Sequence, residues 1–373
     1  MSGLKVVQIG KFYPPHRGGM ESMVQSLCEG LATRGVEVEV LVASDGQRTL
    51  RRKEAGVSIT ESASFGCVKS LSLSPALPAL LRKIPGDLHH LHVPNPLGDI
   101  ALALAPRKPL VVTYHSDIVR QKLSSILLGP LTRSSLNRAE RIVTTWPGQS
   151  EQSRTLAPFR DKCVTIPLGI DPAHFSSNEG ASGLPEEILP AGRDYFLFVG
   201  RLVWYKGLEV LLAAVRLLPP EIAFVIVGKG PLAGWLRQSI ADNNLGKRVI
   251  FIEDAPQDSI PPLYRNCRAL VLPSVAPAEV FGVVQLEAFA SGKPTINTLL
   301  PTGVPWVGQD GLSSITVPPG DAPALAEAIS RLHNDKGLAE HLGRQGYDRM
   351  LREFTLEIMA KRYIDLYGEL VHP

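Results

Sequence analysis

Short apolar runs alternate with amphipathic stretches along most of this chain. In the N-terminal half, the apolar runs have the length of buried strands. Between two of them, residues 20–35 carry apolar side chains at helical spacing and end at a glycine. Such alternation predicts a doubly wound parallel sheet. The strands expected in this half are residues 4–9, 36–43, 87–93, 109–115, 141–145 and 162–167.

The alternation stops at residues 168–194, which are rich in Gly, Pro, Ser and acidic residues, and it starts again at residue 195. The interruption predicts a linker between two domains of the same kind. We therefore expect an α/β protein in which two Rossmann-like, doubly wound domains face a cleft. The expected parts are an N-terminal domain (1–170), a linker (171–194), a C-terminal domain (195–350) and a C-terminal helix (351–373) that returns toward the N-terminal domain.

The composition is typical of a globular protein, with 44% hydrophobic and 20% charged residues among 373. No apolar run approaches the roughly 20 residues of a membrane helix. The first ten residues predict a strand rather than a signal peptide. The four cysteines lie far apart and form no CxxC pair, which favours reduced thiols in a cytoplasmic protein and disfavours a zinc site.

The net charge of +3 conceals an asymmetry. Residues 1–170 contain 21 Lys and Arg against 13 Asp and Glu, whereas residues 171–373 contain 18 against 23. The excess of cations in the first half suits an acidic partner such as anionic lipid or a phosphorylated acceptor, and a solvated surface is the alternative. Nucleic acid is disfavoured, because the charges are dispersed and not interleaved with aromatic residues.

In two motifs of the first half, residues that could bind a ligand directly follow an expected strand. In "FYPPHRGGMES", Gly18 and Gly19 precede a helix, where backbone amides can approach an anion; a tight turn without a ligand is the alternative. In "TYHSD", His115 could hydrogen-bond a substrate hydroxyl or serve as a structural histidine. Neither half carries GxGxxG after its first strand, which disfavours a dehydrogenase.

The motif "VGRLVWYKGLEVLL" lies at the start of the second half. Arg201 follows the first strand there, and Lys206 precedes the first helix. Two cations beside a helix N-terminus can bind a diphosphate. Lys and Arg at this spacing are common, so the position after the first strand of the second sheet is what favours a site.

The stretch "AEVFGVVQLEAFASGKP" contains two carboxylates, Glu279 and Glu287, eight positions apart. Paired carboxylates can be the acid and base of a glycoside hydrolase. Here Glu279 is expected on a loop, and Glu287 about 6 Å along the helix that follows it. We therefore expect the two acids to hold different parts of one extended ligand, with the backbone of residues 281–283 between them.

In this order, the motifs resemble those of the retaining nucleotide-sugar glycosyltransferases of family 4, which have the GT-B fold. The resemblance spans nearly the whole chain, and the two glutamates with seven residues between them are its most specific part. "TYHSDIVRQK" and "NTLLPTGVPWV" are further similar to bacterial members that build surface polysaccharide, among which mannosyltransferases are frequent.

The resemblance implies roles for individual residues. Glu287 would hold the ribose of the donor, and Glu279 would contact the transferred sugar. Arg201 and Lys206 would clamp the diphosphate without a metal ion, and His115 would lie near the sugar. The other donor-binding positions implied are Gly18, Gly19, Phe281, Gly282 and Val283.

The chain departs from the family at Ser314, which stands where a further glycine is common after "GVPWVGQDG". A non-glycine residue in a turn that needs a positive φ angle costs roughly 1 kcal/mol. We therefore expect this loop, which lies outside the diphosphate clamp, to be reshaped.

By the same resemblance, the chain is expected to be a retaining, metal-independent hexosyltransferase of lipopolysaccharide or other surface-polysaccharide biosynthesis. The expected donor is GDP-mannose or a UDP-hexose, with no further cofactor, and the acceptor is a hydroxyl of a glycan or lipid-diphosphate-linked glycan. We expect a cytoplasmic protein in peripheral contact with the inner face of the membrane. The alternatives are a nucleotide-sugar 2-epimerase, which acts on the donor alone, and a catalytically idle donor-binding member.

Overall fold

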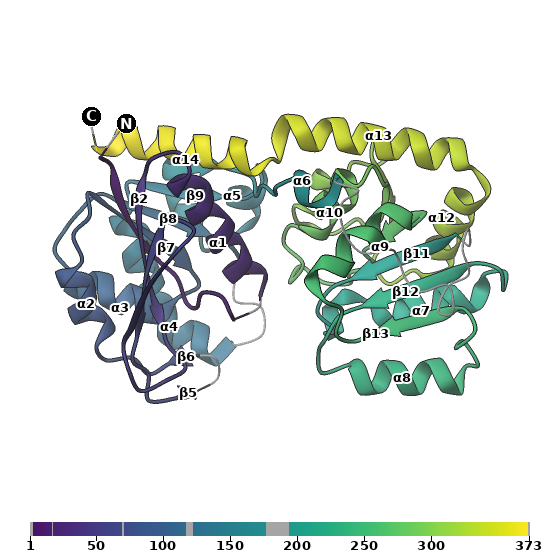
Figure 1. Cartoon of the computed structure of the whole chain (residues 1–373), viewed down its shortest axis with the longest axis horizontal. Coiled ribbons are helices and arrows are strands. Elements are labelled where there is room, and N and C mark those ends of the chain that lie inside the picture. The colour runs from purple at the N-terminus through teal and green to yellow at the C-terminus, as the bar shows by residue number, and fades with distance from the viewer. Residues whose placement is uncertain (1–2, 17, 69–70, 117–121, 177–193, 372–373) are drawn as a thin grey trace. The chain divides into compact units, whose positions relative to one another are not determined.

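The computed structural model describes residues 3–16, 18–68, 71–116, 122–176 and 194–371. The chain forms two compact units, one of Met1–Gly169 with Leu356–Pro373 and the other of Ile170–Thr355. Most of the expected linker, residues 177–193, lies outside the described residues. Each unit has its own mainly parallel sheet, so the predicted α/β class with two doubly wound domains is confirmed (Figure 1).

The N-terminal unit contains an eight-stranded sheet in the order β10-β9-β8-β7-β1-β2-β4-β3. Its strands are β1 (Lys5–Ile9), β2 (Glu37–Ala43), β3 (Leu50–Glu54), β4 (Val57–Ser62), β7 (Leu88–Val93), β8 (Leu110–Tyr114), β9 (Arg141–Thr144) and β10 (Cys163–Thr165), and β5 (Cys67–Val68) and β6 (Leu71–Ser72) form a separate pair. Its helices are α1 (Gly19–Ala32), α2 (Leu77–Lys83), α3 (Pro96–Leu104), α4 (Lys122–Arg138), α5 (Gln149–Gln152) and α14 (Leu356–Val371).

Only β3 runs antiparallel to its neighbour in this sheet. The hydrophobic pattern did not predict β3, because this edge strand has the sequence LRRKE and four of its five side chains are exposed. Charged residues on an edge strand oppose pairing with another chain.

The helix α14 belongs to the N-terminal unit although it lies at the other end of the sequence. It packs against α1 at Gly30, where an added Cβ would lie 3.1 Å from Leu356 and 3.3 Å from Ala360. In Figure 1 the yellow α14 runs beside the purple α1. The close approach of the two helices fixes α14 on this unit.

The second unit contains a six-stranded parallel sheet in the order β13-β12-β11-β14-β15-β16. Numbered along the chain, this is the Rossmann order 3-2-1-4-5-6, which reverses between β11 and β14. The strands are β11 (Tyr195–Val199), β12 (Ala223–Val227), β13 (Val249–Ile252), β14 (Ala269–Val271), β15 (Thr295–Thr298) and β16 (Ser314–Val317). The helices are α6 (Ala173–Ser176), α7 (Leu208–Leu217), α8 (Ala233–Asp242), α9 (Ile260–Asn266), α10 (Val284–Ala290), α11 (Val304–Val307), α12 (Ala322–Asn334) and α13 (Lys336–Glu353).

The helix α7 illustrates how the sequence builds this unit. Its apolar side chains Leu208, Leu211, Leu212 and Val215 recur at helical spacing, and all four are buried in one core. Each contributes roughly 1.5–3 kcal/mol by leaving water. Arg248 donates to the carbonyls of residues 215 and 218, so the end of α7 is satisfied before Pro219.

Ser314 is the first residue of β16, so the expectation of a reshaped loop there is wrong. The turn before it takes its positive φ angle, 71°, at Gly311. Among the described residues, the only non-glycine positions with positive φ are Ala55 and Asn244. The buried Ser314 hydroxyl lies 2.6 Å from Thr295 Oγ1, so the serine adds a hydrogen bond without straining the backbone.

None of the helices within the described ranges combines the length and the apolar composition that a membrane crossing requires.

Candidate active site

The strand order of the second unit indicates where a ligand should bind. In open parallel sheets, ligands bind beyond the carboxyl ends of the strands where the order reverses. Here these are β11 and β14, which are followed by residues 200–207 and 272–283. The two loops touch through their backbones: a Cβ on Gly207, which has φ 70°, would lie 2.0 Å from the carbonyl oxygen of Pro273. Only glycine fits there.

The contact between these loops brings Lys206 and Glu279 together. Lys206 Nζ lies 2.5 Å from Glu279 Oε2, and each residue is only 8% exposed. Ser274 Oγ donates to the same carboxylate oxygen over 3.0 Å. In turn, Thr298 at the end of β15 donates to the Ser274 carbonyl, which fixes the loop. The pair therefore holds one cation and one carboxylate in fixed positions at the predicted ligand edge.

Arg201 supplies a second cation on the same edge. Its side chain is exposed and has no hydrogen-bond or ion-pair partner within the described part of the chain. The positive charge of Arg201 also affects the nearby Tyr205. Burial and Glu279 raise the pKa of the Tyr205 phenol, whereas Lys206 and Arg201 oppose the rise. Arg201 is thus free to bind an anion beside the buried pair.

Glu287 lies in α10, as predicted, and accepts a 2.6 Å hydrogen bond from Tyr264 Oη through Oε2. Burial raises the pKa of Glu287, while the Tyr264 bond and the charges of His174 and Lys206 oppose the rise. Lys206, which pairs with Glu279, is thus also one of the charges that favour ionisation of Glu287. Glu279 and Glu287 each keep Oε1 without a hydrogen-bond partner among the described residues. Each can accept a bond from a ligand hydroxyl.

The segment between the two acids has a constrained backbone with unpaired amides in the described part of the chain. Gly282 has φ 72°, and an added Cβ would lie 2.8 Å from Leu272 Cδ2, so no other residue fits. The ring of Phe281 is buried, edge-on to Trp306. Within the described chain, the amides of Phe281, Gly282 and Val283 have no hydrogen-bond acceptor. They are available to negatively charged oxygens.

Gln285 supports this segment, and the sequence interpretation missed it. Its side chain is fully buried beneath α10. Nε2 donates to the Val304 carbonyl over 3.1 Å, and Oε1 accepts from Asn297 Nδ2 over 2.8 Å and from Thr295 Oγ1 over 3.2 Å. A glutamine within an otherwise apolar run was the available signal. A buried polar network of this kind fixes the start of α10 against β15.

Three predicted residues belong to the N-terminal unit, and their placement beside a donor stays a prediction. Gly18 is the N-cap of α1, and the Glu21 carboxylate occupies the space that a Cβ on Gly18 would need. The space above Gly19 is open. His115 directly follows β8 and is half-buried; its Nε2 lies 3.2 Å from His92 Nδ1.

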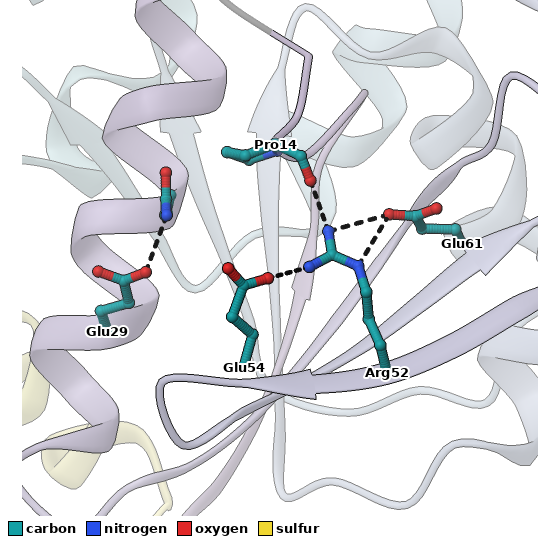
Figure 2. A network of polar contacts seen from close by, with 6 residues as sticks. Pro14, Glu29, Arg52, Glu54 and Glu61 are labelled. Atoms are coloured by element: carbon teal, nitrogen blue, oxygen red, sulfur yellow. Dashed lines mark hydrogen bonds and ion pairs between the residues drawn. The ribbon is translucent and has the colours of Figure 1, made fainter. Parts of the chain in front are cut away.

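The N-terminal unit also contains a cavity of about 530 Å³ beyond the ends of β1 and β2. Its walls are polar, with Glu61 on β4 and a 2.6 Å contact between His16 Nε2 and Asp45 Oδ2. Figure 2 shows how Arg52 holds one wall, by donating to the carbonyl of Pro14 and to Glu61. Tyr13 and Leu50 supply apolar surface. Such a lining suits a polar, hydroxyl-rich ligand.

Comparisons with known proteins show what the chain is similar to. The family models "Glycosyltransferase Family 4" and "Glycosyl transferases group 1" match residues 17–174 and 185–349. The chain is 32% identical to the O-antigen chain mannosyltransferase C of Escherichia coli over 99% of both chains. It is similar in structure to sucrose-phosphate synthase from Thermosynechococcus elongatus (TM-score 0.83, 23% identity, 98% and 99% of the two chains). It is also similar to Anabaena HepE in complex with UDP-glucose (TM-score 0.77, 19% identity, 98% and 100%).

The burial of Glu287 predicts that this site reduces stability. A raised pKa in the folded protein means that ionising Glu287 costs stability above that pKa, and the cost disappears as the pH falls through its usual value of 4.5. Glu287→Gln should therefore raise the melting temperature at pH 7, by about 2–4 °C for each kcal/mol gained. Thermal unfolding of the ligand-free protein between pH 4 and pH 8 measures this, and the gain should vanish near pH 4.

The matched control is Glu327→Gln, which makes the same change on the exposed face of α12 and should have little effect at any pH. A Glu287→Gln protein that is less stable at pH 7, or whose difference from wild type is constant with pH, contradicts the assignment.

Proposed function

The chain belongs to family 4 of the glycosyltransferases and has their GT-B fold, and on that premise we propose that it transfers mannose from GDP-mannose to a hydroxyl of a glycan or lipid-diphosphate-linked acceptor. The observation that carries the proposal is the buried Lys206–Glu279 pair beside the exposed Arg201. The similarity to an O-antigen chain mannosyltransferase over 99% of both chains supports mannose and surface polysaccharide. UDP-glucose in the similar HepE structure supports a nucleotide-sugar donor and keeps a UDP-hexose as the second candidate.

Different residues of the site bind different parts of the donor. Lys206, Arg201 and the free amides of residues 281–283 hold the diphosphate, whose negative charge grows as the sugar leaves. Glu279 accepts a hydroxyl of the sugar, and Glu287 accepts the ribose hydroxyls. Two cations and oriented amides together balance the diphosphate charge, which supports transfer without a metal ion.

The reaction retains the anomeric configuration of the donor. The bond from the sugar C1 to the phosphate oxygen breaks, and the bond from C1 to the acceptor oxygen forms on the same face. The acceptor proton passes to the departing phosphate. This front-face course needs no protein nucleophile, which agrees with the use of both glutamates for binding.

The cavity of the N-terminal unit receives a sugar of the acceptor. Its polar side chains, Asp45, Glu61 and His16, bind hydroxyl groups, and the exposed Leu50 supplies apolar surface. The excess of cations in residues 1–170 supports contact with anionic lipid at the inner face of the cytoplasmic membrane. The protein then works in the cytoplasm on an acceptor that is anchored there.

The transfer reaction itself tests the proposal. Purified protein with GDP-mannose and a panel of lipid-diphosphate-linked oligosaccharides should release GDP and form a mannoside with the donor's anomeric configuration, as followed by NMR. Lys206→Ala should lower turnover about 100-fold, the size expected from losing one charged transition-state contact. Lys229→Ala, which removes an exposed lysine paired with Asp254, is the matched control and should turn over normally.

Two outcomes decide against transfer. An epimerised sugar nucleotide formed without acceptor identifies a 2-epimerase. Tight donor binding with no turnover on any acceptor identifies an idle binding member. Near-normal turnover of Lys206→Ala contradicts the diphosphate clamp.

The acceptor cavity makes a separate prediction. Glu61→Ala should raise the KM for the acceptor about tenfold, the loss expected from one charged hydrogen bond, and leave the KM for GDP-mannose unchanged. Glu54→Ala is the control, because Glu54 also binds Arg52 but does not line the cavity. Initial rates at varied acceptor concentration measure the effect. Equal changes in both variants would show that only the Arg52 network, and not the cavity, is involved.

A further inference from the structure

Hydrogen-bonded side chains cross the interior of the N-terminal unit from α14 toward the end of β8. Tyr363 Oη lies 2.9 Å from Thr113 Oγ1, and that oxygen lies 2.7 Å from His90 Nε2. His90 Nδ1 lies 2.6 Å from Tyr367 Oη, one helical turn farther along α14. All four residues are buried.

The chain of bonds continues through two strands to His115. Gln8 on β1 donates from Nε2 to Tyr367 Oη over 3.2 Å. Its Oε1 lies 2.9 Å from His92 Nε2. The other nitrogen of that ring, Nδ1, lies 3.2 Å from His115 Nε2. The proposed site residue His115 is thus joined by unbroken contacts to the helix α14.

The three imidazoles of this chain are neutral near pH 7. Burial lowers the pKa of His90 to about 3 and that of His115 to about 4, and it holds the pKa of His92 well below its usual value. A neutral imidazole has one N–H donor and one acceptor nitrogen. In each ring, therefore, the nitrogen that donates a hydrogen bond leaves the other nitrogen as an acceptor. The donor–acceptor order of one bond then determines the order of the next.

The side-chain amide of Gln8 determines which nitrogen of each ring donates. Its Oε1 can only accept, so His92 donates from Nε2, and Nδ1 of His92 is left as an acceptor. His115 must then donate from Nε2, which leaves the lone pair of the His115 ring on Nδ1. If the amide turned over, each of these bonds would reverse and His115 would carry its hydrogen on Nδ1.

The bonds on the other side of Gln8 agree with this orientation. Because the amide nitrogen donates to Tyr367, the hydroxyl hydrogen of Tyr367 is directed to His90 Nδ1. His90 then donates from Nε2 to Thr113. In this orientation every member of the chain has a donor for each acceptor it meets.

We propose that Gln8 is a positioning residue that acts through His92 and holds His115 in the tautomer with hydrogen on Nε2 and an acceptor at Nδ1. In this tautomer, His115 receives a hydrogen bond from a hydroxyl of the transferred sugar or of the acceptor, and Nδ1 cannot donate to a phosphate oxygen. The substrate part of this inference rests on the proposed transferase function. Tyr367 stabilises the Gln8 orientation from α14.

The tautomer is measured directly in the ligand-free protein with ¹⁵N-labelled histidine, by two-bond ¹H–¹⁵N correlation. The signal of His115 among the nine histidines is identified by its loss in His115→Asn. We expect a protonated Nε2 and an unprotonated Nδ1. Gln8→Met keeps the volume of the side chain but removes the amide acceptor that orients His92. Both tautomers of His115 should therefore appear. Tyr367→Phe, which frees the amide to turn, should also give a mixture.

Tyr363→Phe is the matched control. It removes the same atom from the same helix, beyond Thr113, and should leave the tautomer of His115 unchanged. A wild-type His115 with its hydrogen on Nδ1, or an unchanged tautomer in both Gln8→Met and Tyr367→Phe, overturns the proposal. If Gln8→Met does not fold, the wild-type protein and Tyr367→Phe decide.

Kinetics separate this inference from the proposed function. Gln8→Met should lower kcat about tenfold without changing the KM for GDP-mannose, because His115 remains present but in a mixed tautomer. Failure of the transferase proposal leaves the NMR result standing. An unchanged tautomer in both Gln8→Met and Tyr367→Phe, in a protein that transfers mannose, overturns the role of Gln8 and leaves the proposed function standing.

Discussion

The ion pair between Lys206 and Glu279 is the interaction on which the donor region depends. Burying two charges costs several kcal/mol per ion, and their attraction offsets this only with good geometry and further hydrogen bonds. The 2.5 Å contact and the Ser274 bond meet that condition. Loss of either partner would leave a buried charge at a cost of about 3–5 kcal/mol. The pair therefore ties the loop after β11 to the loop after β14, and it keeps both charges in place before a ligand arrives.

The rest of the second unit supports this arrangement. The reversal of strand order places the two loops side by side, and glycine at 207 lets their backbones meet. Gln285 fixes the start of α10, so residues 281–283 keep their amides open. The raised pKa of Glu287 is consistent with a cost of such a site, because a partly buried carboxylate kept for a ligand destabilises the fold relative to a neutral side chain.

Much of the fold could be predicted because buried parallel strands are short apolar runs and helices have their own period. The pattern failed at β3, whose exposed and charged side chains carry no such signal, and it also missed β4, whose side chains are mostly buried. It also treated "HHLHV" as an ordinary buried strand. Alternation along a strand puts His90 and His92 on one face. The tyrosines that His90 contacts, Tyr363 and Tyr367, come from the far end of the chain. Partners this distant in sequence cannot be derived from local spacing.

The sequence predicted which residues belong to the site, but it did not predict that Lys206 and Glu279 pair with each other. Spacing and resemblance indicated Lys206, Glu279 and Glu287, but placed the lysine with the diphosphate and Glu279 with the sugar as if they were independent. The structure joins them, so a donor must share or break an existing contact. Ser314 shows the opposite error, where a family pattern suggested strain and the backbone has none.

The affinity for GDP alone tests this account most directly, measured by calorimetry on wild type, Lys206→Met and Glu279→Gln. GDP has a diphosphate but no sugar, so it should gain from Lys206 and be opposed by Glu279. The account predicts weaker binding for Lys206→Met and binding about tenfold tighter than wild type for Glu279→Gln, since the lysine is released from its partner. Weakened GDP binding in Glu279→Gln, equal to that of Lys206→Met, would contradict it.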